Sequence, residues 1–463
     1  MTIPLTWPLI AAGVLLVSLF VLNEVPLKYN LRNLTVRWRT TLLTALAFTS
    51  VVALLTVMLA FVNGMYQLTE NSGHPENLLI LSDGMTDETF STLSSFDVGD
   101  VENQPGVVRQ DGRPLASRET YIVVNQMLPN ARPGWPKRRF LQLRGIDDPV
   151  LAAQVHAIQL FPGGVWFSRA GLEGLQPRED SSSLPRGADA KIHGANGLIS
   201  EMAIQTVLGE GIARELGRDR TPDELAKARN RERLDVGDTF ALGDRTWLIV
   251  GIMQSAGSTF DSEVWAKRSI VAPLFGKDTY TSVVMRCEDA ANARRLKTFF
   301  TTQYKKTALQ ANVETEYYAA LSDTNKQFLW AISFVAIVMS IGGVFGVMNT
   351  MFAAISQRTR DIGVLRLLGY GRRQILVSFL LESMVIALLG GLLGCALGSL
   401  ADGWTANSVV TGGQGGGKFV VLRLAVDQQV LAVGLLLSLF MGFVGGLFPA
   451  LNAMRLRPLE SLR

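Results

Sequence analysis

The sequence predicts an α-helical membrane protein with a large α+β extracytoplasmic domain and five transmembrane helices. Charged residues make up 18% of the 463 residues, below the roughly 25% of an ordinary soluble domain. The deficit lies in five windows without any charged residue, at 1–23, 40–69, 327–357, 383–401 and 428–454. The polar block 64–327 is far too long for a loop, so we expect it to form a folded domain.

Each apolar window predicts one membrane-spanning helix. About 20 consecutive apolar residues cross a bilayer core as a helix, and backbone that crosses lipid must satisfy its own hydrogen bonds. The predicted spans are 4–22, 40–63, 328–355, 375–401 and 429–451. The first, in an extra N-terminal segment 1–24, has an alternative interpretation as a signal peptide. Residues 1–8 carry no positive charge and no small-x-small cleavage site follows, which favours a retained helix.

Positive charge predicts the orientation of these spans. Lys and Arg gather in 25–39, in the loop 356–374 and in the tail 452–463, and segments of this kind stay in the cytoplasm. The block 64–327 and the loop 402–428 then lie outside. Five spans, with the N-terminus outside and the C-terminus inside, satisfy this alternation.

The segment 25–39 also has a helical pattern of its own. Its apolar residues recur at helical spacing, at Leu27, Leu31, Leu34 and Trp38. This pattern predicts an amphipathic cytoplasmic helix in the membrane interface. An ordinary basic linker is the alternative.

The block 64–327 reads as mixed α+β, as one domain or two lobes. Alternating apolar residues predict strands at 77–82 and 120–124, and a hairpin over 235–252 with a Gly-Asp turn. Helices are predicted at 200–216 with Ser200 as cap, at 218–234 with Thr221 and Glu224 as a capping box, at 289–306 and at 316–327. The Pro/Gly/Ser-rich stretch 177–188 predicts a mobile excursion.

Composition and motifs argue against chemistry within this chain. Cys287 and Cys395 cannot build a disulfide framework, because Cys395 lies inside a predicted span. Three scattered histidines leave little material for a zinc site. The excess of Lys and Arg has a topological reason, so nucleic acid is not an expected partner. We expect a non-catalytic chain without a metal or cofactor of its own.

One stretch imitates a nucleotide site. Residues 412–419 (GGQGGGKF) carry Gly417-Lys418 at the spacing of a phosphate-binding loop, but Phe419 stands where Ser or Thr would reach magnesium. No strand is predicted before it and no helix directly after it. We interpret it as a flexible glycine loop.

The most informative stretch is 356–375, between the third and fourth spans. Ile362, Leu365 and Leu368 fall on one face of a short basic helix, which Gly369 and Gly371 would end. Such a helix can anchor the topology, or it can dock into a groove of a cytoplasmic partner through apolar side chains flanked by charge. The pattern by itself leaves both interpretations open.

This stretch resembles the cytoplasmic loop of FtsX-like/MacB-type ABC transporter permeases, with the pattern R-x-x-E-I-G-x-L-R-A-L-G. The matching residues are Arg358, Asp361, Ile362, Gly363, Leu365, Arg366, Leu368 and Gly369. Asp361 replaces the usual Glu and Leu367 the usual Ala. The tail is similar to that family's ending at Pro449, Ala450, Ala453, Pro458, Glu460, Leu462 and Arg463. The hairpin 235–252 and the order of segments are also similar, with a four-helix core to which 4–22 would be an addition.

The resemblance implies a permease subunit of the bacterial inner membrane that works by mechanotransmission. A dimer of ATPases on a separate chain would bind ATP and Mg²⁺ and move a coupling helix, and a second permease copy or homologue would complete the complex. The residues implied in coupling are Arg358, Arg360, Asp361, Leu365, Arg366, Leu368 and Gly369. The implied substrate is a hydrophobic or amphipathic lipoprotein, peptide or drug, with an adaptor, a lipoprotein and membrane lipid as further partners. The alternative is an FtsX-like scaffold that regulates an external cell-wall hydrolase without transport; the long block 64–327 favours transport.

Two further features of the spans have ordinary structural interpretations. Glu382 lies near the cytoplasmic end of the fourth span, where Arg372 or Arg373 would neutralise it. Glycines in the third and fourth spans predict close packing between helices or protomers. These are Gly342, Gly343, Gly346, Gly390, Gly391 and Gly394.

Overall fold

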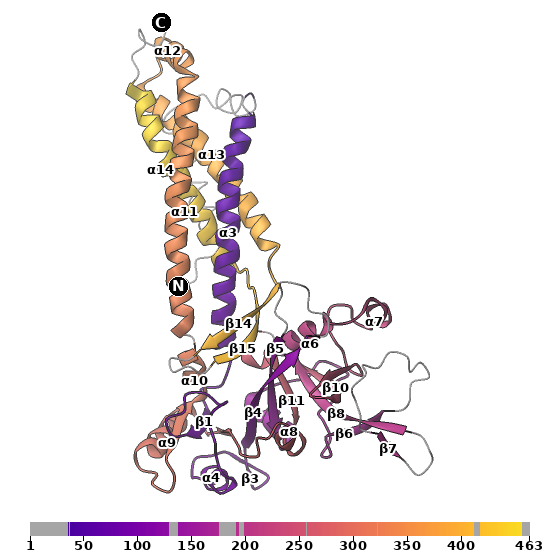
Figure 1. Cartoon of the computed structure of the whole chain (residues 1–463). Coiled ribbons are helices and arrows are strands. Elements are labelled where there is room, and N and C mark those ends of the chain that lie inside the picture. The colour runs from indigo at the N-terminus through magenta and orange to yellow at the C-terminus, as the bar shows by residue number, and fades with distance from the viewer. Residues whose placement is uncertain are drawn as a thin grey trace. The chain divides into compact units, whose positions relative to one another are not determined.

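The computed structural model describes residues 36, 38–128, 138–175, 191–193, 199–255, 257–321, 323–411 and 417–455. The chain divides into two compact units (Figure 1). The membrane unit comprises Met1–Gly64, Gln327–Trp404 and Arg423–Arg463. The α+β unit comprises Met65–Lys326 and Thr405–Leu422.

The membrane unit is built from long apolar helices. They are α3 (Trp38–Glu70), α11 (Asp323–Ser356), α13 (Arg372–Ser399) and α14 (Gln428–Arg455). Within the described residues, four segments are long and apolar enough to cross a membrane: Thr41–Leu68, Leu329–Ser356, Arg372–Ser399 and Gln428–Arg455. This confirms four of the five predicted spans. The predicted span 4–22 and most of the predicted interfacial helix 25–39 lie outside the described residues.

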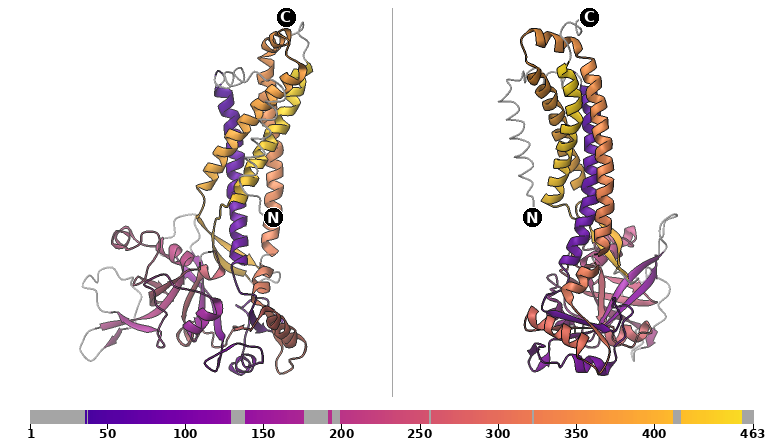
Figure 2. Two further views of the ribbon diagram at one scale, coloured as in Figure 1. Left: turned by 180° about the vertical axis from the view of Figure 1, so that it is seen from behind. Right: turned by 90° about the vertical axis from the view of Figure 1, so that its left-hand side faces the viewer.

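Glycines let α13 approach its neighbours closely, as predicted. A Cβ atom on Gly390 would lie 2.6 Å from the Cβ of Phe48, and one on Gly394 would lie 2.7 Å from the Cβ of Val52, both on α3. Gly391 meets Ser438 of α14 in the same way. The two views in Figure 2 show α13 and α14 running side by side. Small residues therefore set the contacts of α13 on two sides.

The glycines of α11 differ among themselves. Gly343 packs against Met441 of α14, but a Cβ on Gly342 or Gly346 would meet no atom within 4 Å. Close packing between helices is confirmed for Gly343, whereas Gly342 and Gly346 make no such contact within the described chain and their packing against another protomer stays a prediction. Their faces of α11 are open because no helix of the same chain covers them in the described structure.

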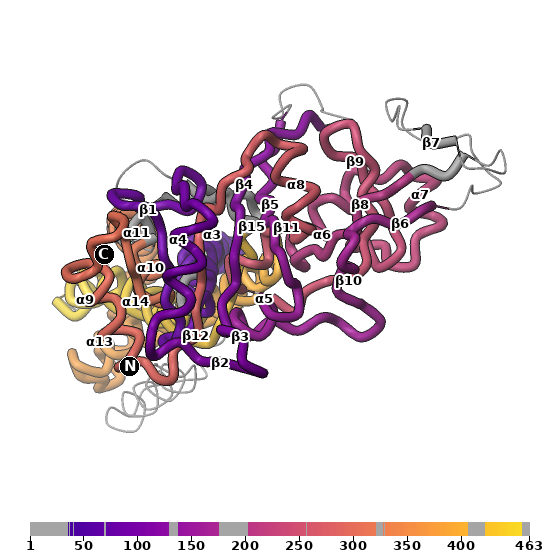
Figure 3. Tube along the Cα trace, turned by 90° about the horizontal axis from the view of Figure 1, so that it is seen from below, coloured from indigo at the N-terminus to yellow at the C-terminus, as the bar shows by residue number. Residues whose placement is uncertain are grey.

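The α+β unit is organised on one large sheet, shown from below in Figure 3. Eleven described strands belong to it, in the order β13-β1-β12-β4-β5-β11-β8-β10-β9, with β6 and β7 also paired to β8. Their bounds are β1 Asn77–Ser82, β4 Ala116–Met127, β5 Arg138–Ile146, β6 Leu172–Leu175, β7 Lys191–His193, β8 Ile199–Gly209, β9 Thr239–Leu242, β10 Arg245–Met253, β11 Glu263–Lys267, β12 Ser282–Arg286 and β13 Leu309–Val313. A small hairpin, β2 Arg109–Gln110 and β3 Arg113–Pro114, stands apart.

Helices of this unit lie between the strands in sequence. They are α4 Ser95–Val101, α5 Pro149–His156, α6 Glu210–Gly217, α7 Pro222–Lys227, the 3₁₀ turn η1 Thr259–Ser262, α8 Arg268–Leu274, α9 Ala290–Thr302 and α10 Glu314–Leu321. One apolar core includes Leu78, Val283 and Phe300. A second includes Leu143, Trp247 and Val264. A single sheet thus carries two apolar cores.

Several predicted elements of this unit are confirmed. The strands at 77–82 and 120–124 are β1 and part of β4, and the helix at 289–306 is α9. The predicted hairpin is β9 and β10, whose turn residues Gly243 and Asp244 have φ of 60° and 55°. Two successive positive φ angles define the tight turn that Gly-Asp predicts.

Two helix predictions are wrong in part. Residues 200–209 form strand β8, so Ser200 lies in a strand, and helix α6 begins only at Glu210 after the N-cap Gly209. Strand β8 is central in the sheet, with β10 paired to one edge and β11 to the other, and these partners come from a later part of the chain. The capping box of Thr221 and Glu224 is confirmed, but α7 ends at Lys227 and buries none of its residues.

Two other segments also differ from prediction. The stretch 316–327 falls on two helices, since α10 ends at Leu321 and α11 begins at Asp323. The loop 402–428 contains a hairpin of β14 (Thr405–Thr411) and β15 (Gly417–Arg423), which places Lys418 in a strand. The predicted excursion 177–188 and residues 412–416 of the glycine loop lie outside the described residues.

Candidate functional site: the helix between α11 and α13

The predicted cytoplasmic helix is α12 (Thr359–Leu367), which connects α11 to α13. Gly369 has a φ of 100°, a conformation that glycine adopts without strain. Just after it, the N–H of Tyr370 donates to the carbonyl of Leu365 at 3.1 Å and closes the last turn. Gly371 is then the N-cap of α13, where its N–H donates to the side chain of Gln374 at 2.7 Å. Both predicted glycine stops are therefore in place.

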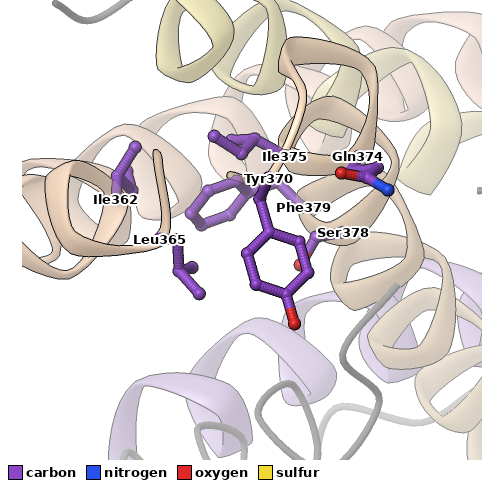
Figure 4. Close-up of a pocket in the computed structure, with 7 residues that line it drawn as sticks. All are labelled: Ile362, Leu365, Tyr370, Gln374, Ile375, Ser378 and Phe379. Atoms are coloured by element: carbon purple, nitrogen blue, oxygen red, sulfur yellow. The ribbon is translucent and has the colours of Figure 1, made fainter. Parts of the chain in front are cut away.

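One face of α12 packs inward onto α13. Ile362 is buried, and Leu365 is half-buried beside it. A small pocket is lined by Ile362, Leu365, Tyr370, Gln374, Ile375, Ser378 and Phe379. Figure 4 shows the ring of Phe379 and the side chain of Ile375 behind that of Tyr370 in this pocket. These apolar contacts attach α12 to the first turns of α13.

The opposite face of α12 is apolar and exposed. Val364, Leu367 and Leu368 are 47%, 64% and 71% exposed. Arg360 is exposed on the same stripe, because positions i, i+4, i+7 and i+8 share one side of a helix. This corrects the sequence-based grouping of Ile362, Leu365 and Leu368. Of these three, only Leu368 belongs to the outer face, which we define as Arg360, Val364, Leu367 and Leu368.

Charge around the outer face is mostly positive. Asp361 is exposed, Arg366 is half-buried, and Arg372 and Arg373 are exposed at the start of α13. Together with Arg360, these residues amount to four arginines and one aspartate that are exposed or half-buried. An apolar stripe with a basic border suits a partner groove that is apolar inside and acidic at its rim.

Arg358, grouped by resemblance with the coupling residues, points inward instead. It is only 2% exposed, and its guanidinium donates two hydrogen bonds to Glu382 of α13, at 2.7 and 2.9 Å. The guanidinium also lies 6.0 Å from the ring centre of Phe379. The expected partners of Glu382, Arg372 and Arg373, are thus replaced by Arg358. Sequence spacing could not reveal this, because the pair joins two different helices.

The ion pair of Arg358 and Glu382 is bidentate, and pairs of this geometry are strong contacts. Arginine and carboxylate match each other's planar geometry, and the charges attract more strongly away from water. Arg358 is also the N-cap residue of α12. The pair therefore couples the start of α12 to the body of α13, in addition to the chain connection at Gly371.

Among the residues that the structure describes, no group of three or more His, Cys, Asp or Glu is placed to hold a metal ion. What the site offers is a rigidly mounted helix with an exposed apolar stripe. Together with four apolar helices and a large α+β unit, this defines a multi-pass membrane protein with an exposed apolar helix face between two spans.

The comparisons with known proteins name the family. Residues 41–301 match the MacB-like periplasmic core domain, and residues 333–458 match the FtsX-like permease C-terminal domain. The first match alone covers more than half of the chain, so the protein belongs to the family of membrane permeases with a MacB-like periplasmic core domain and an FtsX-like permease domain. The α+β unit is accordingly its periplasmic domain.

Relatives with similar sequences carry related names. The uncharacterized ABC transporter permease YknZ of Bacillus subtilis (strain 168) is 28% identical over 244 residues, which cover 49% of this chain and 57% of YknZ. The macrolide export ATP-binding/permease protein MacB of Bdellovibrio bacteriovorus is 26% identical over 281 residues, which cover 56% of this chain and 38% of MacB. The matches therefore span less than two thirds of these relatives.

Solved structures with a partial likeness carry the same two protein names. The extracellular domain of YknZ from Gram-positive bacteria has a TM-score of 0.30 at 11% identity, covering 51% of this chain and 99% of that domain. The periplasmic region of MacB from Actinobacillus actinomycetemcomitans has a TM-score of 0.29 at 13% identity, covering 56% of this chain and 94% of that region. Scores this low support no inference of their own.

Proposed function

We propose that this chain is the permease subunit of an ABC-type transporter, and that it couples ATP hydrolysis by a separate ATPase chain to a change of shape in its periplasmic domain. The outer face of α12 is the observation that carries this proposal. Burying Val364, Leu367 and Leu368 in a partner groove would remove apolar surface from water, which is favourable in proportion to its area. Family membership supplies the kind of partner, a cytoplasmic ATPase.

The Arg358–Glu382 pair supports the mechanical part of the proposal. A helix that transmits force must move as one body with a membrane helix, and the pair joins α12 to α13 away from solvent. We therefore propose two roles within the predicted coupling set. Arg360, Asp361, Arg366 and Leu368 face or border the partner, whereas Arg358, Leu365 and Gly369 hold the helix in position.

The test is co-purification of the full-length tagged chain with an ATP-hydrolysing subunit. The double variant Leu367→Asp/Leu368→Asp should lower the recovered ATPase activity at least tenfold, because it places charge in an apolar contact. Leu225→Asp is the matched control, since Leu225 is an exposed leucine of the periplasmic domain. Unchanged ATPase recovery with the double variant would overturn the docking role of α12.

The same purification separates two kinds of function. We favour transport of a hydrophobic or amphipathic substrate such as a lipoprotein, peptide or drug, since one relative is named for macrolide export. A lipoprotein or adaptor found with the chain would support transport, whereas a cell-wall hydrolase would support the scaffold alternative. The additional helix at 4–22 remains part of the proposal, with its N-terminus outside; cysteine labelling from the outer side tests it.

A further inference from the structure

The middle of the periplasmic sheet carries a charged face that is buried. Strands β4, β5 and β11 pair so that Tyr121 lies opposite Arg144, and Arg144 opposite Trp265. Since side chains alternate along a strand, the same face also receives Glu119 and Glu263. The other face of these strands is apolar and belongs to the second core. Such strands usually expose their polar face to water, yet Glu119, Arg144 and Glu263 are fully buried.

Two segments that lead to the membrane helices reach this face through His156 of α5 and through the turn η1, which lie against it. Glu314 is the first residue of α10, which precedes α11 in the chain. The ring of His156 lies between two carboxylates. Its Nδ1 is 3.0 Å from Oε1 of Glu314, and its Nε2 is 2.7 Å from Oε1 of Glu119. The backbone N–H of His74, just after α3, also donates to Glu314, at 2.9 Å. The end of α3 and the start of α10 thus meet at one buried carboxylate.

The end of α3 makes a second contact beside this face. The hydroxyl of Ser72 accepts a hydrogen bond at 2.8 Å from the backbone N–H of Thr259, in the turn before β11. Phe260, next in that turn, packs edge-on against Tyr318 of α10, with ring centres 6.2 Å apart. We call the charged face of β4, β5 and β11 the seat, and the segments 65–74 and 314–321 its cover.

Among the described residues, the ion pairs at the seat contain more carboxylates than cations. Arg144 pairs with Glu88, Glu119 and Glu263, and His156 pairs with Glu119 and Glu314. Four carboxylates therefore share two cations. Burial lowers the pKa of His156, but the charges and hydrogen bonds of its two glutamates outweigh this and raise the pKa to about 10, so the ring is charged at neutral pH.

When the cover leaves, water can hydrate the charged groups that the cover keeps buried. Buried charges lose their hydration, and removing the cover would restore it. Buried polar atoms near the seat also lack a hydrogen-bond partner among the described residues: Asn77 Oδ1, Ser117 Oγ and Thr259 Oγ1. Native structures leave few such groups without partners. An aliphatic contact of the same size would have no comparable gain on exposure, because its opening would only expose apolar surface.

We propose that the seat is a contact built to open: the end of α3 and α10 leave the charged face of β4, β5 and β11 and return to it, while both apolar cores stay closed. Opening exposes charged side chains together with the rings of Phe260 and Tyr318, so the hydration of the charges is set against the exposure of these rings. Because both covering segments continue into membrane helices, movement of those helices reaches the middle of the sheet at this contact.

Thiol labelling of the full chain in lipid nanodiscs tests the proposal without any ATPase. Thr259→Cys places a reporter under the cover, and Ser117→Cys, on the same face of β4, is a second reporter should the first variant fold poorly. The native Cys287, buried in the first apolar core, reports opening of that core. Cys395 is replaced by Ala, and each labelling rate is divided by the rate of the same thiol in the unfolded chain.

We expect the reporter at 259 to react at least tenfold faster than Cys287. His156→Gln should accelerate the reporter at least tenfold more than it accelerates Cys287, because the bridge between Glu119 and Glu314 that it weakens lies at this contact, whereas Cys287 reacts only through opening of its own core. Equal rates for the two thiols would show that the seat opens only when the domain unfolds. That result, or equal acceleration of both thiols by His156→Gln, would overturn the proposal.

Discussion

Removing the charge of His156 is the perturbation for which the structure allows the most complete prediction. Its two ring nitrogens contact Glu119 and Glu314, and all three side chains are buried. His156→Leu would leave the two carboxylates without their shared cation. Breaking a buried ion pair by removing one partner costs about 3–5 kcal/mol, so we expect a loss of this size in the free energy of unfolding of the periplasmic domain.

The pH dependence gives an independent value for the same contact. The pKa of His156 is about 10 in the folded protein, against an ordinary value of 6.5. At ~1.4 kcal/mol per pH unit, this interval corresponds to a stabilisation of at most about 5 kcal/mol. Because the pKa is higher in the folded state, the stabilisation is complete below pH 6.5. It falls progressively as the pH rises from 6.5 to 10.

The assay is urea unfolding of the full chain in detergent at pH 6 to 10, followed by tryptophan fluorescence. Trp265 lies 5.8 Å from the ring of His156 and reports on this region. The wild type should lose stability steadily with pH, whereas His156→Leu should be weaker at pH 6 and show a much flatter dependence. Parallel curves for the two proteins would refute the assignment of a charged, stabilising His156.

Two further predictions concern the membrane unit. Arg358→Glu and Glu382→Arg should each lower thermal stability in detergent by about 3–5 kcal/mol, and the double exchange should recover at least half of the loss; no recovery would argue against a specific pair. Gly394→Ala should destabilise by about 1–3 kcal/mol, because its Cβ would lie 2.7 Å from that of Val52. Gly342→Ala, at an open position, should be neutral or stabilise by up to ~1 kcal/mol, and a loss there equal to that of Gly394→Ala would contradict the packing.

Prediction from the sequence worked best where the signal is local. The uncharged windows predicted four spans that the structure contains, and a Gly-Asp pair predicted the turn between β9 and β10. Gly369 predicted the end of α12 because a positive φ is needed there. Each of these features depends on residues within a few positions of one another. The helix predicted at 200–209 was wrong because these residues pair with β10 and β11, and pairing with segments far along the chain is not a local signal.

The candidate site was predicted in position but not in orientation. Helical spacing places Ile362, Leu365 and Leu368 near one side, yet it cannot say which side another helix will cover. The structure turns Ile362 toward α13 and leaves Val364 and Leu367 exposed. The partner of Glu382 was missed for a related reason, since Arg358 reaches it only through the packing of α12 on α13.

By itself, the sequence determined which segments are long and apolar enough to cross a membrane, where α12 begins and ends, and which side of the membrane the arginines favour. These properties follow from hydration, charge and backbone geometry over short stretches of chain. Only the tertiary structure decided that a charged face of β4, β5 and β11 lies buried, and that Arg358, next to α12, faces inward. Burial depends on what covers a residue, and the covering segments come from distant parts of the chain.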